Sequence, residues 1–205
     1  MGVPGHDGEV GDYSPEGYEA HDRIRRETLA RLAAAPVENE RDRIAKEAME
    51  DVLSLRGDLF EAGDHFRLSG FRNATTTMRM VFDLMPRATE EDWQNIAARL
   101  SKLPAAIAAY RVTIDEGQRK GVPSARRQVA EAIRQSGVYG GAAGARSFFD
   151  GLVEAHEQAG AGGGSLTAEL RRGADEASAA YRDFSRYLEE QFMDGAVDRD
   201  GVGRD

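Results

Sequence analysis

Cysteine is absent from the 205 residues of this chain, so disulfide bonds and thiolate metal sites are excluded. No apolar run approaches the roughly 20 residues that a membrane-spanning helix requires. The opening residues, MGVPGHDGEVGDYS, lack the basic and then apolar pattern of a secretory signal peptide. These absences predict a soluble, cytoplasmic protein that has no membrane partner.

A surplus of basic residues is missing too. The chain has 27 Lys and Arg residues against 36 Asp and Glu residues, which gives a formal net charge of −9. This balance argues against a nucleic acid or an anionic membrane surface as the main partner. Hydrophobic residues make up 40% of the chain, and many of them are alanines. We therefore expect a thin helical core that is packed largely with alanine.

The stretch over residues 78–121 has the clearest helix punctuation. Pro86 ends a first helix, because a proline disfavours the α conformation of the residue before it. Thr89 is placed to cap a second helix, and Asp92 completes a capping box. Pro104 suits the first turn of a third helix, so the stretch predicts a helical hairpin. The apolar stripes of its two arms have spacings of three and four and consist of Trp93, Ile96, Leu100 and Leu103, then Ile107, Tyr110 and Ile114.

Two further helices are expected before this stretch. Ser14 followed by Pro15 is a typical helix start, and the helix should run to about Ala35. A second helix from about Glu40 to Ala62 is long enough to pack antiparallel on the first. The expected buried sides are Ala20, Ile24, Thr28 and Leu32 in the first helix, and Ala45, Met49, Val52, Leu55 and Leu59 in the second.

The last third of the chain alternates helices with glycine-rich segments. Ser124 is expected to cap a helix that ends near Gly137. Connectors follow at residues 137–145 and 160–164, on either side of a short helix. The last long helix starts at Ser165 and keeps one apolar face for about six turns.

No strand pattern and no fixed-period repeat are found. The sequence therefore predicts an all-α fold, a bundle of about six to eight helices that are mostly antiparallel and joined by Gly-rich connectors. The expected organisation is a disordered segment at residues 1–13, a helical domain at residues 14–192 and a disordered tail at residues 193–205.

Two histidines lie in patterns that resemble metal sites. His156 and Glu157 begin like the zinc motif H-E-x-x-H, but glycine stands where the second histidine should be. Glu61 and His65 are four residues apart with Asp64 nearby, and the commoner meaning of such a pattern is a solvated helix end. We therefore expect no metal ligand and no catalytic residue in this chain.

Arg79, Asp83 and Trp93 are the candidates for a functional surface. The alternative is that Arg79 and Asp83 form an internal ion pair and that Trp93 is a core residue, because a buried tryptophan usually serves packing. The sequence contains neither a Gly-x-Ser-x-Gly nucleophile elbow nor a Gly-x-x-x-x-Gly-Lys-Ser/Thr phosphate loop. The residues alone therefore name no reaction.

Several segments together carry a resemblance to a known family. They are YSPEGYEAHDRI at 13–24, EAGDHFR at 61–67, FDLMPRATEEDWQNIAARL at 82–100, LPAAIAAYR at 103–111, RRQV at 126–129 and DGVGRD at 200–205. Over about residues 13–205 the chain resembles a bacterial family, the domain-of-unknown-function family 885. The block that begins FDLMP is the most specific part of the resemblance.

Full-length members of that family are similar to zincin-type metallopeptidases and have an H-E-x-x-P-G-H-H-like segment beyond the region that aligns here. In them the two histidines would bind zinc and the glutamate would activate water. This segment is absent from the chain, so no zinc ligand or catalytic residue is carried over. The resemblance implies the amino-terminal helical half of a zincin-like hydrolase, a truncated fragment that is inactive alone, has no cofactor of its own and builds one wall of a substrate channel.

The partner that the resemblance implies is the missing carboxy-terminal catalytic half, in the same chain or as a second polypeptide. Helices that face this half should expose apolar residues, and self-association of the chain is a further expectation. A non-enzymatic helical module that binds another protein is the alternative function. The side chains expected to form the exposed patch are Tyr181, Phe184 and Leu188 of the last helix.

Overall fold

The structure is a computed structural model that describes residues 5–71 and 73–199. Within these residues it contains seven α-helices and no strand beyond an isolated bridge between Ala125 and Val197, which confirms the expected all-α fold. The helices are α1 (Pro15–Ala34), α2 (Glu40–Glu61), α3 (Ala74–Leu84), α4 (Glu90–Arg119), α5 (Arg126–Gly140), α6 (Phe148–Ala159) and α7 (Gly164–Tyr187). Short helical turns follow at η1 (Asp64–Phe66), η2 (Ala142–Gly144), η3 (Leu188–Phe192) and η4 (Met193–Gly195).

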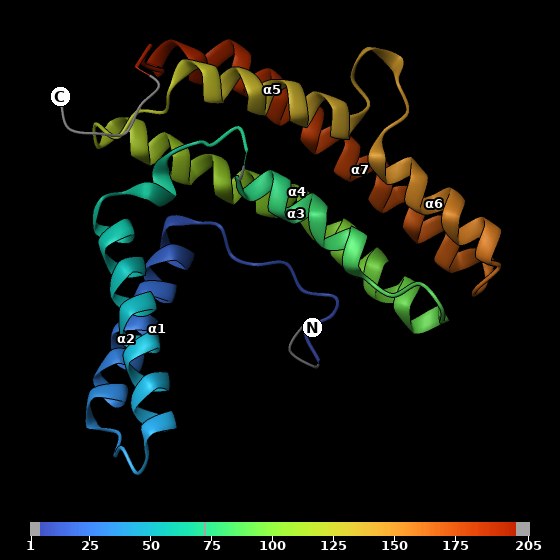
Figure 1. The fold of residues 1–205 in the computed structure, drawn as a ribbon. Helices are drawn as coiled ribbons and strands as arrows, with labels where there is room; N and C mark the ends of the chain where they lie inside the picture. Colours follow the sequence, from blue (N-terminus) through green and yellow to red (C-terminus); the bar gives the residue numbers. More distant parts are fainter. Residues whose placement is uncertain (1–4, 72, 200–205) are drawn as a thin grey trace.

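Two parts of unequal size make up the molecule. Helices α3 to α7 form an elongated body, whereas α1 and α2 form an antiparallel hairpin that projects away from one end of it (Figure 1). Turn η1 links the hairpin to the body and packs on α4. A Cβ atom at Gly117 of α4 would lie 2.5 Å from the Cβ of Phe66, so the absence of a side chain there permits this close contact.

Helix α4 is one continuous helix of 30 residues, so the predicted break at Pro104 is wrong. The cost of an interior proline is about 3 kcal/mol, because one backbone hydrogen bond is lost. Burying a single large apolar side chain is worth about 1.5–3 kcal/mol, and both stripes are buried in phase along one face of the helix. Packing on both sides of Pro104 therefore outweighs the local preference for a break.

Helix α7 runs along this face of α4 and comes very close to it. A Cβ atom at Gly173 would lie 2.8 Å from the Cβ of Leu100. The expectation of an exposed patch on the last helix is wrong, because its three side chains are buried in the core. These side chains are Tyr181, Phe184 and Leu188, with exposed fractions of 0%, 3% and 0%.

The buried side predicted for α2 is wrong, since all five of its residues are exposed, whereas on the side predicted for α1 only Ile24 is exposed and the other three residues are half-buried. Asp22, Arg25 and Gly57 line the contact between the two helices, and a Cβ atom at Gly57 would lie 2.6 Å from a terminal nitrogen of Arg25. Most of the large apolar side chains of α2 face the solvent instead. Those with the largest exposed fractions are Leu55 (59%), Ile44 (54%) and Val52 (50%), and Ile24 of α1 is exposed at 58%.

Helix ends follow the predicted caps in most cases. The side chain of Ser14 accepts the N–H of Gly17, and Thr89 forms the predicted capping box with Asp92. The predicted cap at Ser124 is wrong, since its hydroxyl accepts the backbone N–H of Leu68 at 2.8 Å from another part of the chain. Helix α5 then continues past Gly137 and ends at Gly140.

The two ends of the chain lie partly outside the described residues, at 1–4 and 200–205. Residues 5–13, expected to be disordered, form no helix but lie along α4, where Arg99 donates to the carbonyl of Asp7 at 2.5 Å and Lys102 to that of Gly8 at 2.9 Å. In the expected tail, Val197 donates its N–H to Ser124 at 3.0 Å and accepts that of Arg126 at 2.8 Å. Among the described residues, no helix combines the length and the apolar character needed to cross a bilayer.

A substitution at the closest approach of α4 and α7 tests this packing. We expect Gly173→Ala to lower the free energy of unfolding by about 1–3 kcal/mol, because the added methyl group has no room beside Leu100. The control is Gly151→Ala in α6, where the added atom meets only the side chain of Arg146 at 3.5 Å; it should raise stability by about 0.5–1 kcal/mol. Urea denaturation measures both values, and a Gly173→Ala protein as stable as the control would contradict the described contact.

Candidate functional site

Two cavities lie where the hairpin meets the body, and a third lies beside them between α1 and α2 of the hairpin. Their volumes are about 520, 480 and 450 Å³. Phe60 lines all three, and Tyr18, Asp22 and His65 each line two of them. We call this region the junction crevice and take it as the candidate site, because its neighbouring cavities share these lining residues.

His65 is the centre of the aromatic cluster in the junction crevice. Its ring stacks on Phe60 with 4.6 Å between ring centroids and an interplanar angle of 8°, and it also contacts Phe66 at 3.9 Å and Tyr18 at 5.1 Å. Burial lowers the pKa of His65, and the nearby charge of Lys120 lowers it further. The Nδ1 atom is buried and has no hydrogen-bond partner among the described residues.

A buried carboxylate organises the hairpin side of the crevice. Asp22 is only 7% exposed and pairs with Arg25 at 2.7 Å and with Arg26 at 2.9 Å. Arg25 also donates to the carbonyl oxygen of Leu53 in α2 at 3.4 Å. The helices of the hairpin are therefore joined by a charged group that is itself held in place, an arrangement that needs the bare backbone of Gly57.

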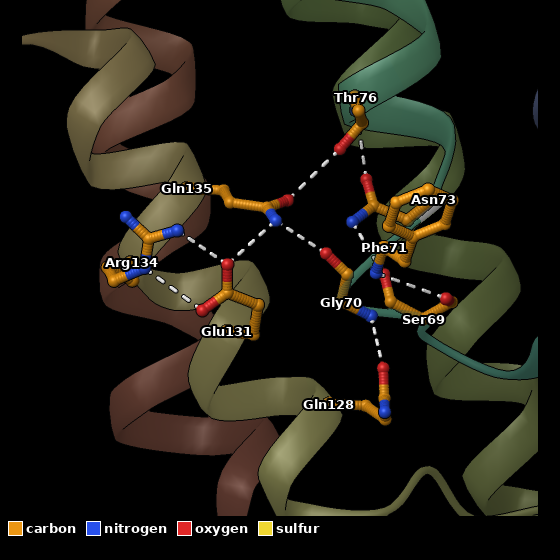
Figure 2. A network of polar contacts seen from close by, with 9 residues as sticks. All are labelled: Ser69, Gly70, Phe71, Asn73, Thr76, Gln128, Glu131, Arg134 and Gln135. Carbon is orange, nitrogen blue, oxygen red and sulfur yellow. Dashed lines mark hydrogen bonds and ion pairs between the residues drawn. The ribbon is translucent and has the colours of Figure 1, made fainter.

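A loop fixed by α5 forms another wall. The N–H of Gly70 donates to Gln128 at 2.6 Å, and the amide of Gln135 donates to the carbonyl oxygen of Gly70 at 2.5 Å (Figure 2). The same amide contacts Glu131, whose pKa is lowered to about 2 by its hydrogen bonds, chiefly from Arg134. The loop backbone is therefore held from both its N–H and its carbonyl side.

Asn73 connects this loop to α3. Its side-chain oxygen accepts the N–H of Thr76 at 2.9 Å, and its amide donates to the carbonyl oxygen of Ser69 at 2.8 Å (Figure 2). Asn73 and Ser69 both line the cavity of 480 Å³. Asn73 is thus both the N-cap of α3 and part of the crevice wall.

Three tyrosines that line this cavity stay neutral well above physiological pH. Burial raises the pKa of Tyr18 to about 12, and it also raises the pKa values of Tyr13 and Tyr110 above their ordinary value. Tyr13 and Tyr110 pack edge to face with ring centroids 6.4 Å apart. The crevice therefore presents aromatic faces and uncharged phenols.

The structure brings two of the three sequence-predicted surface residues together. Arg79 and Asp83 form an ion pair of 2.5 Å along α3, and the guanidinium group of Arg79 lies 4.0 Å from the ring centre of Phe148. Trp93 is only 1% exposed and packs edge to face on His156 with centroids 5.0 Å apart. Trp93 is thus a core residue, as the alternative interpretation has it, whereas the ion pair is not internal, because the side chain of Asp83 is 46% exposed.

The residues weighed as metal ligands have other neighbours. His156 is buried, with Nε2 2.5 Å from the carbonyl oxygen of Ala161. Glu61 and His65 line the cavity of 520 Å³, and Asp64 and His65 line that of 480 Å³. Within residues 5–71 and 73–199, no three His, Cys, Asp or Glu side chains lie close enough together to hold a metal ion.

The sequence analysis did not predict the junction crevice, although two of the segments that carry the family resemblance contain its residues. Tyr18 and Asp22 belong to the segment YSPEGYEAHDRI, and His65 belongs to EAGDHFR. Both segments carry the resemblance to one family, yet 36 residues lie between them in the chain. The structure shows that they meet at one site, whereas the FDLMP block lies in the body.

The fold and the crevice define an all-helical protein in which a projecting hairpin and an elongated body enclose a common site. The chain belongs to the family described as "Bacterial protein of unknown function (DUF885)", whose family model matches residues 1–205. A search among curated proteins finds no match. Membership of the family is therefore established, and the activity has to be inferred from the site.

The lowered pKa of His65 has a consequence for stability that can be measured. Above the unfolded pKa of about 6.5 the imidazole is neutral in both states; as the pH falls below it, the unfolded chain takes up a proton that the folded chain resists, so the free energy of unfolding falls. We expect His65→Phe, which keeps an aromatic ring in the stack, to lose less stability than the parent protein between pH 7.5 and pH 5.5, both chosen to bracket about 6.5.

Urea denaturation at the two pH values measures this difference. The control is His21→Gln, which removes an exposed imidazole on α1 and keeps His65. This variant should follow the parent protein. An equal loss of stability in His65→Phe and in the parent protein would show that burial of His65 does not oppose its protonation.

Proposed function

We propose that this chain is the helical, substrate-binding part of a metal-dependent hydrolase that acts on a peptide-like bond. In this proposal a polypeptide outside residues 1–205 supplies the zinc ligands and the glutamate that activates water. Support comes from the resemblance to zincin-like members of the family, together with the absence of an H-E-x-x-P-G-H-H segment from the sequence. The chain would contribute the junction crevice as one wall of the substrate channel.

A surface on the hairpin carries the proposal. We define the hairpin stripe as the apolar side chains Ile44, Ala48, Val52, Leu55 and Leu59, which share one face of α2 at spacings of three and four. All five are exposed. Contiguous exposed apolar surface on a helix is typical of a protein–protein interface.

The hairpin stripe does not lie on the face of α2 that contacts α1. Leu53, Gly57 and Phe60 face α1, and in the α helix they lie on the side opposite the hairpin stripe. The contact between the two helices therefore includes Arg25 and Gly57 beside Leu53 and Phe60, while the side chains of the hairpin stripe face outward. Burying each of these large apolar side chains between the two helices would stabilise the hairpin by about 1.5–3 kcal/mol, and this stabilisation is absent when they face outward.

The hairpin stripe continues into the junction crevice. Leu59 belongs to the stripe and also lines the cavity of 480 Å³, next to Arg56. A partner that covers the stripe would therefore lie at the edge of this cavity. This continuity favours a partner that contacts the same substrate as the crevice does. In the proposal the metal-bearing polypeptide is that partner.

The test pairs this chain with a polypeptide from the same genome that carries the H-E-x-x-P-G-H-H segment. We expect zinc binding and peptidase activity in the mixture and neither in the chain alone. The double substitution Val52→Lys and Leu55→Lys should weaken the complex at least about 10-fold, because two charged groups replace buried apolar contacts. The matched control is Val138→Lys, at an exposed position of α5.

Calorimetry measures the affinity, and metal analysis after dialysis measures the zinc content. One zinc ion retained by this chain alone would overturn the proposal. Unchanged affinity in the doubly substituted protein would remove the hairpin stripe from the interface. If the substitutions instead dissociate a homodimer, the stripe belongs to a contact between two copies, and the chain is a non-enzymatic interaction module.

A further inference from the structure

One cavity of the junction crevice has the walls of a ligand site in its own right. This cavity, which we call the tyrosine crevice, has a volume of about 480 Å³, within the range of about 300–1,000 Å³ typical of small-molecule sites. Its aromatic walls are Tyr13, Tyr18, Phe60 and Tyr110. Faces of this kind favour a flat or large apolar group.

The charged side chains on the walls of the tyrosine crevice have a net positive excess of one. Arg56 and Arg67 both line it, and neither has a carboxylate partner among the described residues. Arg67 is held by donating to the carbonyl oxygen of Ala62 at 3.2 Å. Asp64 is the acidic residue on the wall, so with a neutral His65 the two guanidinium groups exceed the negative charge by one.

We propose that the tyrosine crevice binds a single carboxylate carried next to an aromatic ring, as at the free carboxyl terminus of a peptide that ends in Phe, Tyr or Trp. The ring would pack on the tyrosine and phenylalanine faces. The carboxylate would accept hydrogen bonds from the guanidinium groups of Arg56 and Arg67, which match its geometry. This site goes beyond the proposed function, because binding needs no residue outside this chain.

The walls are held in place before a ligand arrives. The loop that follows Arg67 is fixed to α5 through Gly70, and Asn73 ties it to α3. The phenols of Tyr13 and Tyr18 stay neutral near pH 7 because burial raises their pKa values, so they can donate hydrogen bonds to a carboxylate. A pre-formed site binds with a smaller loss of conformational entropy.

The charge balance also distinguishes a carboxylate from a phosphate. A phosphate monoester has a charge of about −1.5 to −2 at pH 7, more than the net positive excess of one on these walls can match. Its second charge would be repelled by Asp64 on the same wall. A monoanion is therefore the better match for the tyrosine crevice.

Titration of the isolated chain with N-acetyl-L-phenylalanine tests the proposal, followed by NMR shifts or calorimetry. Three probes remove one feature each: N-acetyl-L-phenylalaninamide has no carboxylate, N-acetylglycine has no ring, and phenyl phosphate replaces the carboxylate. We expect each of the three to bind at least about 10-fold more weakly than the acid. The affinity for the acid should fall as salt is added.

Two variants locate the binding groups, and a third serves as the control. Arg56→Gln and Arg67→Gln should each lower the affinity for N-acetyl-L-phenylalanine about 10-fold. Arg41→Gln removes an exposed arginine from the same helix as Arg56, far along it, and should leave the affinity unchanged. Circular dichroism and thermal melting verify that the three variants are folded.

Several outcomes would overturn the proposal. They are equal binding of the acid and its amide, tighter binding of phenyl phosphate, arginine variants that bind like the parent protein, or no binding of the acid up to about 10 mM. None of these outcomes bears on the hairpin stripe or its partner, because the measurement uses this chain alone. Conversely, a failure to bind the metal-bearing polypeptide would leave the tyrosine crevice unaffected.

Discussion

The close packing of α4 against α7 is the contact on which the other elements depend. It requires two long apolar faces in phase and a glycine, Gly173, where the helices are nearest. Helices α5 and α6 then pack on α7, and α3 packs on α4. The hydroxyl of Tyr181 reaches through the core to the carbonyl oxygen of Thr75 at 2.6 Å, which ties the start of α3 to the same pair. The body is therefore built outward from one helix pair.

The hairpin is attached to this pair by different forces. Phe66 lies against Gly117 near the end of α4, and Lys120 lies 4.8 Å from the ring centre of Phe66. Inside the hairpin the contact centres on Asp22 and Arg25 rather than on large apolar side chains. The junction crevice lies between an apolar body and a polar hairpin, which explains why it combines aromatic walls with guanidinium groups.

Local signals in the sequence predicted most of the helices but not their packing. The caps at Ser14 and Thr89 and the residue before Pro86 mark helix ends correctly, because capping depends on neighbours in the chain. Pro104 does not end the helix, because its local cost is smaller than the gain from burying both stripes of α4. The apolar residues keep spacings of three and four from Trp93 to Ile114 without a break at Pro104, and this pattern indicates a single helix.

The candidate site was harder to predict, for a related reason. The sequence of an amphipathic helix indicates which face is apolar, but it does not indicate whether other residues bury that face. In α2 the apolar face is exposed to solvent. Ser124 looked like a cap but bonds to Leu68, 56 residues away in the chain. Which residues meet in the crevice is decided by such long-range contacts, and no local pattern records them.

The arginine enclosed in the hairpin has a consequence for how the crevice is reached. Cooperative units with little buried apolar area open at a lower free energy than the core does. The hairpin is such a unit, since its inner contact is a guanidinium group over a glycine and its attachment to the body is narrow. Local opening of α1 and α2 is therefore expected to cost less free energy than unfolding of the body, so the hairpin walls of the crevice can move while the pair of α4 and α7 stays folded.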